Sequence, residues 1–251
     1  MEPELSSEKA CEAVCFVGGA AHSGSTLLGL ALGSHPAVVY AGEANKSRFL
    51  GDERKPLRKR TCKVCGVACP VWRDLRIGPE RDVYEALAAR TGRRIVVDST
   101  KALPWLEEQS ARLATRGVSL VFVVLGRDGR AVLGSGLRKY PERSAREHAH
   151  AWIAQMEATD AFAARFPGRV VRVRYEELVT RPAATLEGLA RELGLALDER
   201  MLDPFAQEHH PIGGNAGAQS LLRRAEPIEL AAGGAAGRGA EKKGADYDEH
   251  P

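Results

Sequence analysis

Short apolar runs alternate along the chain with stretches in which apolar residues recur at helical spacing. The runs have the length of buried strands and cover residues 14–17, 38–42, 94–98, 119–125 and 170–175. Helical spacing follows at residues 27–32, 81–90, 103–116, 128–140, 142–166 and 183–193. The run at 119–125 is apolar on both faces and belongs in the middle of a parallel sheet. The pattern therefore predicts an α/β fold with a central, mostly parallel sheet flanked by helices.

The turn after the first strand has the composition of an anion-binding loop. Residues 20–26 read Ala-Ala-His-Ser-Gly-Ser-Thr, and leucines at helical spacing begin directly after them. A helix that starts there leaves unpaired backbone N–H groups and a positive dipole end, which together favour a phosphate. We expect a phosphate cradle made of backbone and hydroxyl groups of Ser23, Gly24, Ser25, Thr26 and Leu27.

The same loop departs from the P-loop of nucleotide hydrolases at one position. The gap from Gly19 to Gly24 matches Gly-x-x-x-x-Gly-Lys-Ser/Thr, but Ser25 stands where the lysine is required. The missing lysine argues against ATP or GTP hydrolysis. An ordinary strand–turn–helix with a glycine stop is the alternative interpretation.

Further polar side chains follow the predicted strands, at the end where an open parallel sheet binds its ligands. They are His22, Glu43, Lys101, Arg127 and Tyr175. Ser135 lies about two helical turns after Asp128, so it and Arg127 can both face the cradle. An arginine and a hydroxyl that converge there suit a second phosphate. The alternative for Arg127 is an ion pair with a surface carboxylate.

Together the two segments resemble the sulfotransferases that use 3′-phosphoadenosine 5′-phosphosulfate (PAPS). The family's first loop reads Arg/Lys-Ser-Gly-Ser/Thr-Thr, and here His22 replaces the basic residue; its second motif is an Arg with a Ser eight positions later, as in Arg127 and Ser135. Arg-Asp-Gly-Arg-Ala at 127–131, Gly42-Glu43 and Arg-Tyr-Glu-Glu-Leu at 174–178 are similar to the tyrosylprotein branch. Cys-Gly-x-x-Cys-Pro-x-Trp at 65–72 resembles bacterial members. The resemblance covers residues 13–197 and implies a P-loop-type three-layer sandwich.

The resemblance also implies the activity and a role for each candidate residue. A sulfuryl group would pass from PAPS to a hydroxyl or amine of a small-molecule or carbohydrate acceptor, with no metal and with release of adenosine 3′,5′-bisphosphate. The cradle of residues 23–27 would hold the 5′-phosphate, Arg127 and Ser135 the 3′-phosphate, and Tyr175 would pack at the nucleotide. The catalytic candidates are His22 as donor to the leaving phosphate, Glu43 as general base, and Lys101 beside the sulfuryl oxygens.

Each role has a simpler alternative. His22 would then only hydrogen-bond the loop, and Glu43 would only pair with Lys46 or Arg48. For the chain as a whole, the alternatives are a P-loop nucleotide kinase or phosphotransferase, and a non-catalytic nucleotide-binding protein on the same fold.

Length and composition set the wider expectations. The 251 residues suffice for one large α/β domain, and a net charge of +3 gives no reason to expect nucleic acid as a partner. We expect a flexible tail at 1–12, the domain at 13–224 with an insertion at 46–75, and a low-complexity, disordered tail at 225–251. The chain has no apolar stretch of membrane-span length and no secretory signal, so we expect a cytoplasmic protein.

Five cysteines without an export signal indicate reduced thiols. Cys62, Cys65 and Cys69 have part of the spacing of a zinc knuckle, but three thiols fall one short of a Cys₄ site. His209 is the candidate fourth ligand. On this count the sequence predicts no metal.

Overall fold

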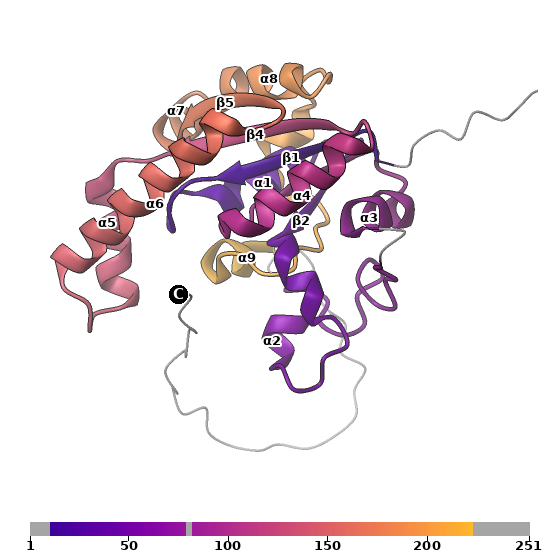
Figure 1. Ribbon diagram of the computed structural model, residues 1–251, viewed down its shortest axis with the longest axis horizontal. Coiled ribbons are helices and arrows are strands. Elements are labelled where there is room, and N and C mark those ends of the chain that lie inside the picture. Colours follow the sequence, from indigo (N-terminus) through magenta and orange to yellow (C-terminus); the bar gives the residue numbers. More distant parts are fainter. Residues whose placement is uncertain (1–10, 79–81, 223–251) are drawn as a thin grey trace, which may run out of the picture.

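The computed structural model describes residues 11–78 and 82–222. The predicted tail at 225–251, and residues 1–10 of the predicted tail at 1–12, lie outside the described residues. The central sheet has five strands in the order β2-β3-β1-β4-β5, and every neighbouring pair is parallel (Figure 1). The strands are β1 (Ala13–Gly18), β2 (Val38–Gly42), β3 (Ile95–Asp98), β4 (Ser119–Gly126) and β5 (Arg169–Arg174). The predicted parallel α/β fold is confirmed.

Helices cover both faces of this sheet (Figure 1). They are α1 (Ser25–Gly33), α2 (Leu57–Arg60), α3 (Val83–Thr91), α4 (Leu103–Thr115), α5 (Gly129–Lys139), α6 (Ala145–Arg165), α7 (Tyr175–Thr180), α8 (Pro182–Glu192) and α9 (Ala216–Leu222). Three short 3₁₀ helices are η1 (Ala44–Phe49), η2 (Glu199–Leu202) and η3 (Pro204–Ala206). Within the described residues, no helix is long and apolar enough to cross a bilayer.

The central strands are apolar throughout because both of their faces are buried. In β1, Val14 and Phe16 pack with α3, α4 and α6, whereas Cys15 and Val17 pack with α1 and α8. Successive side chains of a strand point to opposite faces, so one short strand contributes to both cores. This explains why the sequence shows unbroken apolar runs there and not alternation.

Several local features differ from the sequence expectations. The last strand ends at Arg174, and Tyr175 begins the unpredicted helix α7. Helix α9 was also not predicted. Ile153, which helical spacing at 142–166 would place on the apolar face of that helix, is 44% exposed because the first half of α6 pairs with α5 beyond the sheet (Figure 1).

The segment between β2 and α3 folds over the carboxyl end of β2. It contains η1 and α2, and its residue Cys62 forms a backbone bridge with Ile212 from the C-terminal part of the chain. Ile212 in turn forms a bridge with Gly42 at the end of β2. At the opposite end of the sheet, Glu12 joins the starts of two strands, because its N–H donates to Arg94 and its carbonyl accepts from Ser119.

Candidate functional site

The loop between β1 and α1 is tight, and three of its six residues have a positive φ. His22 has φ 64° and Gly24 has φ 94°, and Gly24 also caps α1. Gly19, with φ 128°, lies so close to the carbonyl oxygen of Leu125 that a Cβ atom would collide with it. The tight loop starts α1 directly at the carboxyl end of β1. The first N–H groups of α1 therefore lie at this edge of the sheet, as an anion site requires.

Arg127 lies against this loop. Its Nη1 donates a hydrogen bond of 2.7 Å to the carbonyl oxygen of His22, and its guanidinium lies 4.2 Å from the ring centroid of Tyr175. The ring of Tyr175 occupies the space where a Cβ atom on Gly24 would stand. The structure thus brings Arg127, Tyr175 and the loop together, although they come from the ends of three different strands.

Two buried polar atoms in this group have no hydrogen-bond partner among the described residues: the Oγ of Ser23 and the Nε of Arg127. Buried polar groups in folded proteins are nearly always paired. An anion bound in this group is one partner that would satisfy both atoms. The loop, Arg127 and Tyr175 fit a ligand that carries phosphate groups.

Lys101 reaches the same loop from the end of β3. Its Nζ donates a hydrogen bond of 2.6 Å to the Oγ of Ser25, the first residue of α1. Burial lowers the pKa of Lys101 to about 8, and the nearby carboxylate of Glu43 opposes that shift. Below pH 8 the ammonium group is charged and lies beside the cradle.

Glu43, directly after β2, is paired. Its carboxylate lies 2.6 Å from the Nζ of Lys46, and its backbone N–H donates to the carbonyl oxygen of Ile212. The alternative contact with Lys46 is therefore present in the structure. The carboxylate is about a quarter exposed, with 28% of the side chain accessible, so an acceptor can reach it.

Asp98 is a site residue that the sequence analysis missed. This fully buried carboxylate at the end of β3 accepts hydrogen bonds from the backbone of Ala44 and Thr100 and from the hydroxyl of Tyr84. Burial raises the pKa of Asp98, and the hydrogen bonds oppose that rise. Asp98 thus joins the loop that carries Glu43 to the loop that carries Lys101. A lone carboxylate at the end of an apolar strand was the available signal.

His22 is half-buried beside a cavity of about 120 Å³ that also touches Tyr140, His148 and Trp152. Burial is the main cause that lowers the pKa of His22 to about 4, and the neighbouring Lys139, His148, Arg127 and Lys101 contribute in the same direction. In the free protein His22 is therefore neutral at pH 7. The charged form that the sequence analysis expects requires bound phosphates to raise the pKa.

Two further candidates are Thr26, in the cradle itself, and Ser135 on α5. Thr26 is buried, and its Oγ1 accepts a hydrogen bond of 3.1 Å from the backbone of Asn215. Ser135 is half-buried on α5, and its contact with a 3′-phosphate stays a prediction.

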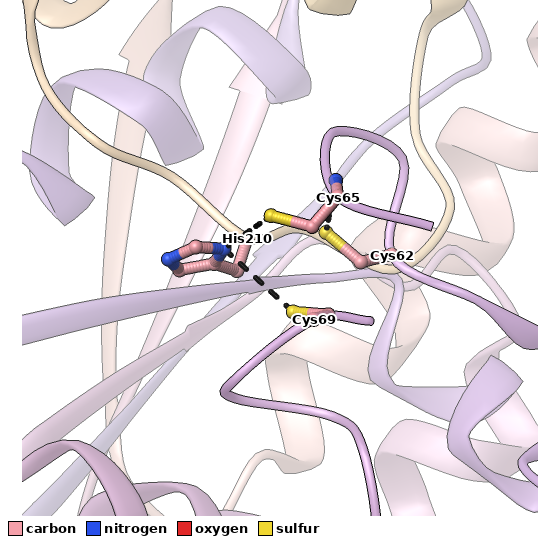
Figure 2. Close-up of side chains that lie close together, drawn as sticks. All are labelled: Cys62, Cys65, Cys69 and His210. Carbon is pink, nitrogen blue, oxygen red and sulfur yellow. Dashed lines mark hydrogen bonds between the residues drawn. The ribbon is translucent and has the colours of Figure 1, made fainter. Parts of the chain in front are cut away.

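A separate cluster joins the three predicted cysteines to a histidine (Figure 2). The histidine is His210, so the expectation that His209 would be the fourth group is wrong. The ring of His209 instead contacts Ser34 and the carbonyl oxygen of Pro204. Neighbouring side chains in an extended segment point to opposite sides, which separates the two histidines.

Comparisons with known proteins agree with this architecture. The model of the sulfotransferase family matches residues 120–199, which span β4 to η2. A search of curated proteins finds no match.

Two solved structures share the fold. The sulfotransferase domain from the curacin biosynthetic pathway is 19% identical, with 83% of this chain and 82% of that chain covered and a TM-score of 0.56. The sulfotransferase domain from the Synechococcus PCC 7002 olefin synthase is also 19% identical, with 90% and 92% covered and a TM-score of 0.57. The fold and the sequence match over residues 120–199 together confirm the resemblance of this chain to the sulfotransferase family.

Proposed function

We propose that this protein is a sulfotransferase that takes its sulfuryl group from PAPS and passes it to a hydroxyl or amine of a small-molecule or carbohydrate acceptor. One observation carries the proposal. Arg127, at the end of β4, lies against the loop that follows the neighbouring strand β1, and the Nε of Arg127 and the Oγ of Ser23 are buried without partners. A nucleotide with phosphates on both sides of its ribose would pair both atoms.

The two anion-binding elements divide the nucleotide between them. The N–H groups at the start of α1, with the hydroxyls of Ser25 and Thr26, bind the 5′-phosphate. Arg127 binds the 3′-phosphate together with Ser135, which lies on the following helix α5. Tyr175 packs beside the nucleotide, where its ring already supports Arg127.

PAPS supplies an SO₃ unit that moves in line from a phosphate oxygen to the acceptor oxygen or nitrogen, in the manner of phosphoryl transfer. Lys101 holds its positive charge beside Ser25 and stabilises the negative charge on the transferring group. His22, once nearby phosphates raise its pKa, donates a proton to the leaving phosphate. Glu43 accepts the proton of the acceptor hydroxyl, and Lys46 keeps this carboxylate oriented.

The protein's cysteines fit the cytoplasmic location that the sequence predicts. None of the five is in a disulfide bond in the structure, which suits a reducing compartment.

A thermal-shift assay with adenosine 3′,5′-bisphosphate, compared with ATP plus Mg²⁺, tests the proposed donor. A ligand at 100 times its Kd stabilises the folded state by about 2.7 kcal/mol, which raises Tm by about 5–10 °C in a protein of this size. We expect this shift with the bisphosphate. A shift with ATP plus Mg²⁺ alone would support a nucleotide kinase instead.

Two glycine variants locate the effect. Gly24→Ala places a Cβ atom at a φ of 94° and against the Tyr175 ring, so the ligand-induced shift should disappear. Gly188→Ala is the matched control, because a Cβ atom there meets nothing within 4 Å. Incubation with radiolabelled PAPS and a panel of hydroxyl and amine acceptors then tests catalysis. Binding of the bisphosphate without transfer to any acceptor would point to a non-catalytic nucleotide-binding protein.

A further inference from the structure

The three cysteines and His210 form a compact set of metal-ligand atoms. The sulfur atoms of Cys62, Cys65 and Cys69 and a ring nitrogen of His210 all lie within 4.8 Å of one another (Figure 2). The Nδ1 of His210 is 3.1 Å from the sulfur of Cys65 and 3.6 Å from that of Cys69. Ligands on a tetrahedral zinc ion, with bonds of about 2.0–2.3 Å, lie about 3.5–3.8 Å apart. The four groups therefore need only small shifts to enclose one ion.

The backbone around the first two cysteines has the form of a metal-binding turn. The N–H groups of Val64 and Cys65 point at the sulfur of Cys62, at 3.4 and 3.5 Å. Gly66 follows with a φ of 67°, and its N–H closes the turn on the carbonyl oxygen of Cys62. N–H groups directed at a sulfur stabilise its thiolate form, which is the form that binds metal.

His210 is oriented from its other side. Its Nε2 lies 2.9 Å from a carboxylate oxygen of Glu208, and its carbonyl oxygen accepts a hydrogen bond from the indole of Trp72. The carboxylate fixes the proton on Nε2 and leaves the lone pair of Nδ1 facing the thiols. Histidines that bind metals typically have such a carboxylate partner.

We propose that Cys62, Cys65, Cys69 and His210 bind one Zn²⁺ ion as a structural site. Three thiolates and an imidazole are soft-to-borderline ligands in the number and arrangement that zinc prefers. The protein fills all four positions, so no position is left for a substrate or a reactive water. Cys62 and Cys69 are 3% and 1% exposed, which shields the ion from solvent.

The site joins two segments that are far apart in the sequence. Residues 62–69 belong to the segment between β2 and α3, and His210 belongs to the C-terminal segment. Directly after His210, the carbonyl of Pro211 accepts from Lys63, and Ile212 bonds to both Ala41 and Glu43. The ion therefore holds the C-terminal segment in place against the backbone that carries Glu43. It positions the carboxylate proposed as the general base but does not touch the reacting atoms.

Elemental analysis of the full-length protein, purified without added metal, tests the ion directly. We expect about one zinc per chain, in line with four protein ligands on one ion. This measurement does not depend on sulfate transfer, so it stands even if the proposed function fails. A zinc-free protein, iron in place of zinc, or a disulfide among the three cysteines would overturn the proposal.

Matched variants assign the ligands. Cys65→Ser and His210→Ala should lose the zinc, whereas Cys11→Ala and His209→Ala should retain it, because Cys11 and His209 lie outside the cluster. Cobalt substitution gives a second readout in protein that stays folded: intense visible bands of tetrahedral Co²⁺ and a near-ultraviolet thiolate band are expected. Zinc retained in both cluster variants, or octahedral cobalt spectra, would contradict the assignment.

Discussion

The Nζ of Lys101 donates a hydrogen bond of 2.6 Å to the Oγ of Ser25 and so brings a cation from the end of β3 to the first residue of α1. Ser25 occupies the position where a nucleotide-hydrolysing P-loop has its lysine. In this protein the neighbouring strand supplies the positive charge that the loop itself lacks. The cation therefore lies at the start of the helix, where a transferred group would meet the phosphate.

Lys101→Met should reduce kcat of sulfate transfer by about 10²–10³, as loss of one preorganised electrostatic group does in other enzymes. Binding of adenosine 3′,5′-bisphosphate should change much less, because the N–H groups of α1 and Arg127 stay in place. Steady-state kinetics and calorimetric titration separate the two effects. The control is Arg191→Met on α8, a side chain that is 75% exposed. Equal losses of kcat and of affinity would mean that Lys101 only shapes the loop.

Glu43 and Lys46 offer a paired test of the proposed base. Glu43→Gln removes the proton acceptor and should lower kcat by about 10²–10⁴ with little change in nucleotide affinity. Lys46→Met removes the ion-pair partner at 2.6 Å but leaves the carboxylate, so kcat should fall by about tenfold or less. If both variants lose activity equally, the ion pair and not the base explains the role of Glu43.

The protonation state of His22 should depend on whether the nucleotide is bound. Burial lowers the pKa of His22 from 6.5 to about 4 in the free protein, and bound phosphates should raise it. The folded state disfavours the proton, so the stability that neutral His22 contributes is present above pH 6.5 and is lost as the pH falls through 4. Nuclear magnetic resonance of the His22 ring measures its pKa in the free protein and in the complex with the nucleotide.

Ligand binding and His22 titration must then be linked. Between the two pKa values, binding takes up a proton, so the ratio of wild-type affinity to that of His22→Asn should increase as the pH falls from 7 toward 4. The comparison of the two proteins removes the titration of the ligand itself. An unchanged ratio would show that His22 only completes the loop.

The sequence predicted the sheet and the positions of the candidate residues because parallel strands end at one edge. Each apolar run is a strand, and Glu43, Lys101, Arg127 and Tyr175 follow four of these strands directly or within a few residues. Contacts across the sheet were not predictable in this way. The bond from Lys101 to Ser25 depends on the neighbour relation of β3 and β1, which a linear pattern does not contain.

The choice between His209 and His210 shows a second limit. In an extended segment, alternate side chains face opposite sides, so the sequence leaves open which histidine faces the cysteines. The bridges of Ile212 to Gly42 and to Cys62 fix that choice. Each bridge joins residues more than a hundred positions apart in the sequence, so no local pattern encodes it.

Arg127 should distinguish ligands by their 3′-phosphate. Adenosine 3′,5′-bisphosphate and adenosine 5′-monophosphate differ only in that group, so binding of the two ligands tests this role. Arg127→Ala should lower the affinity for the bisphosphate by about 10- to 100-fold, which is the effect of losing charge-assisted hydrogen bonds. The affinity for the monophosphate should fall much less. Arg127→Lys keeps the charge but loses the planar fork, and it should lie between wild type and Arg127→Ala.

The comparison of two ligands also controls for damage to the loop. Arg127 bonds to the carbonyl oxygen of His22 and covers Tyr175, so a purely structural role would weaken both ligands by the same factor. Arg174→Ala, an exposed arginine at the end of the next strand, should leave both affinities unchanged. Ser135→Ala should reproduce a smaller, selective loss for the bisphosphate, because Ser135 is assigned to the same phosphate. Equal weakening of both ligands in Arg127→Ala would separate Arg127 from the nucleotide, and the proposed use of PAPS would then lack its second phosphate site.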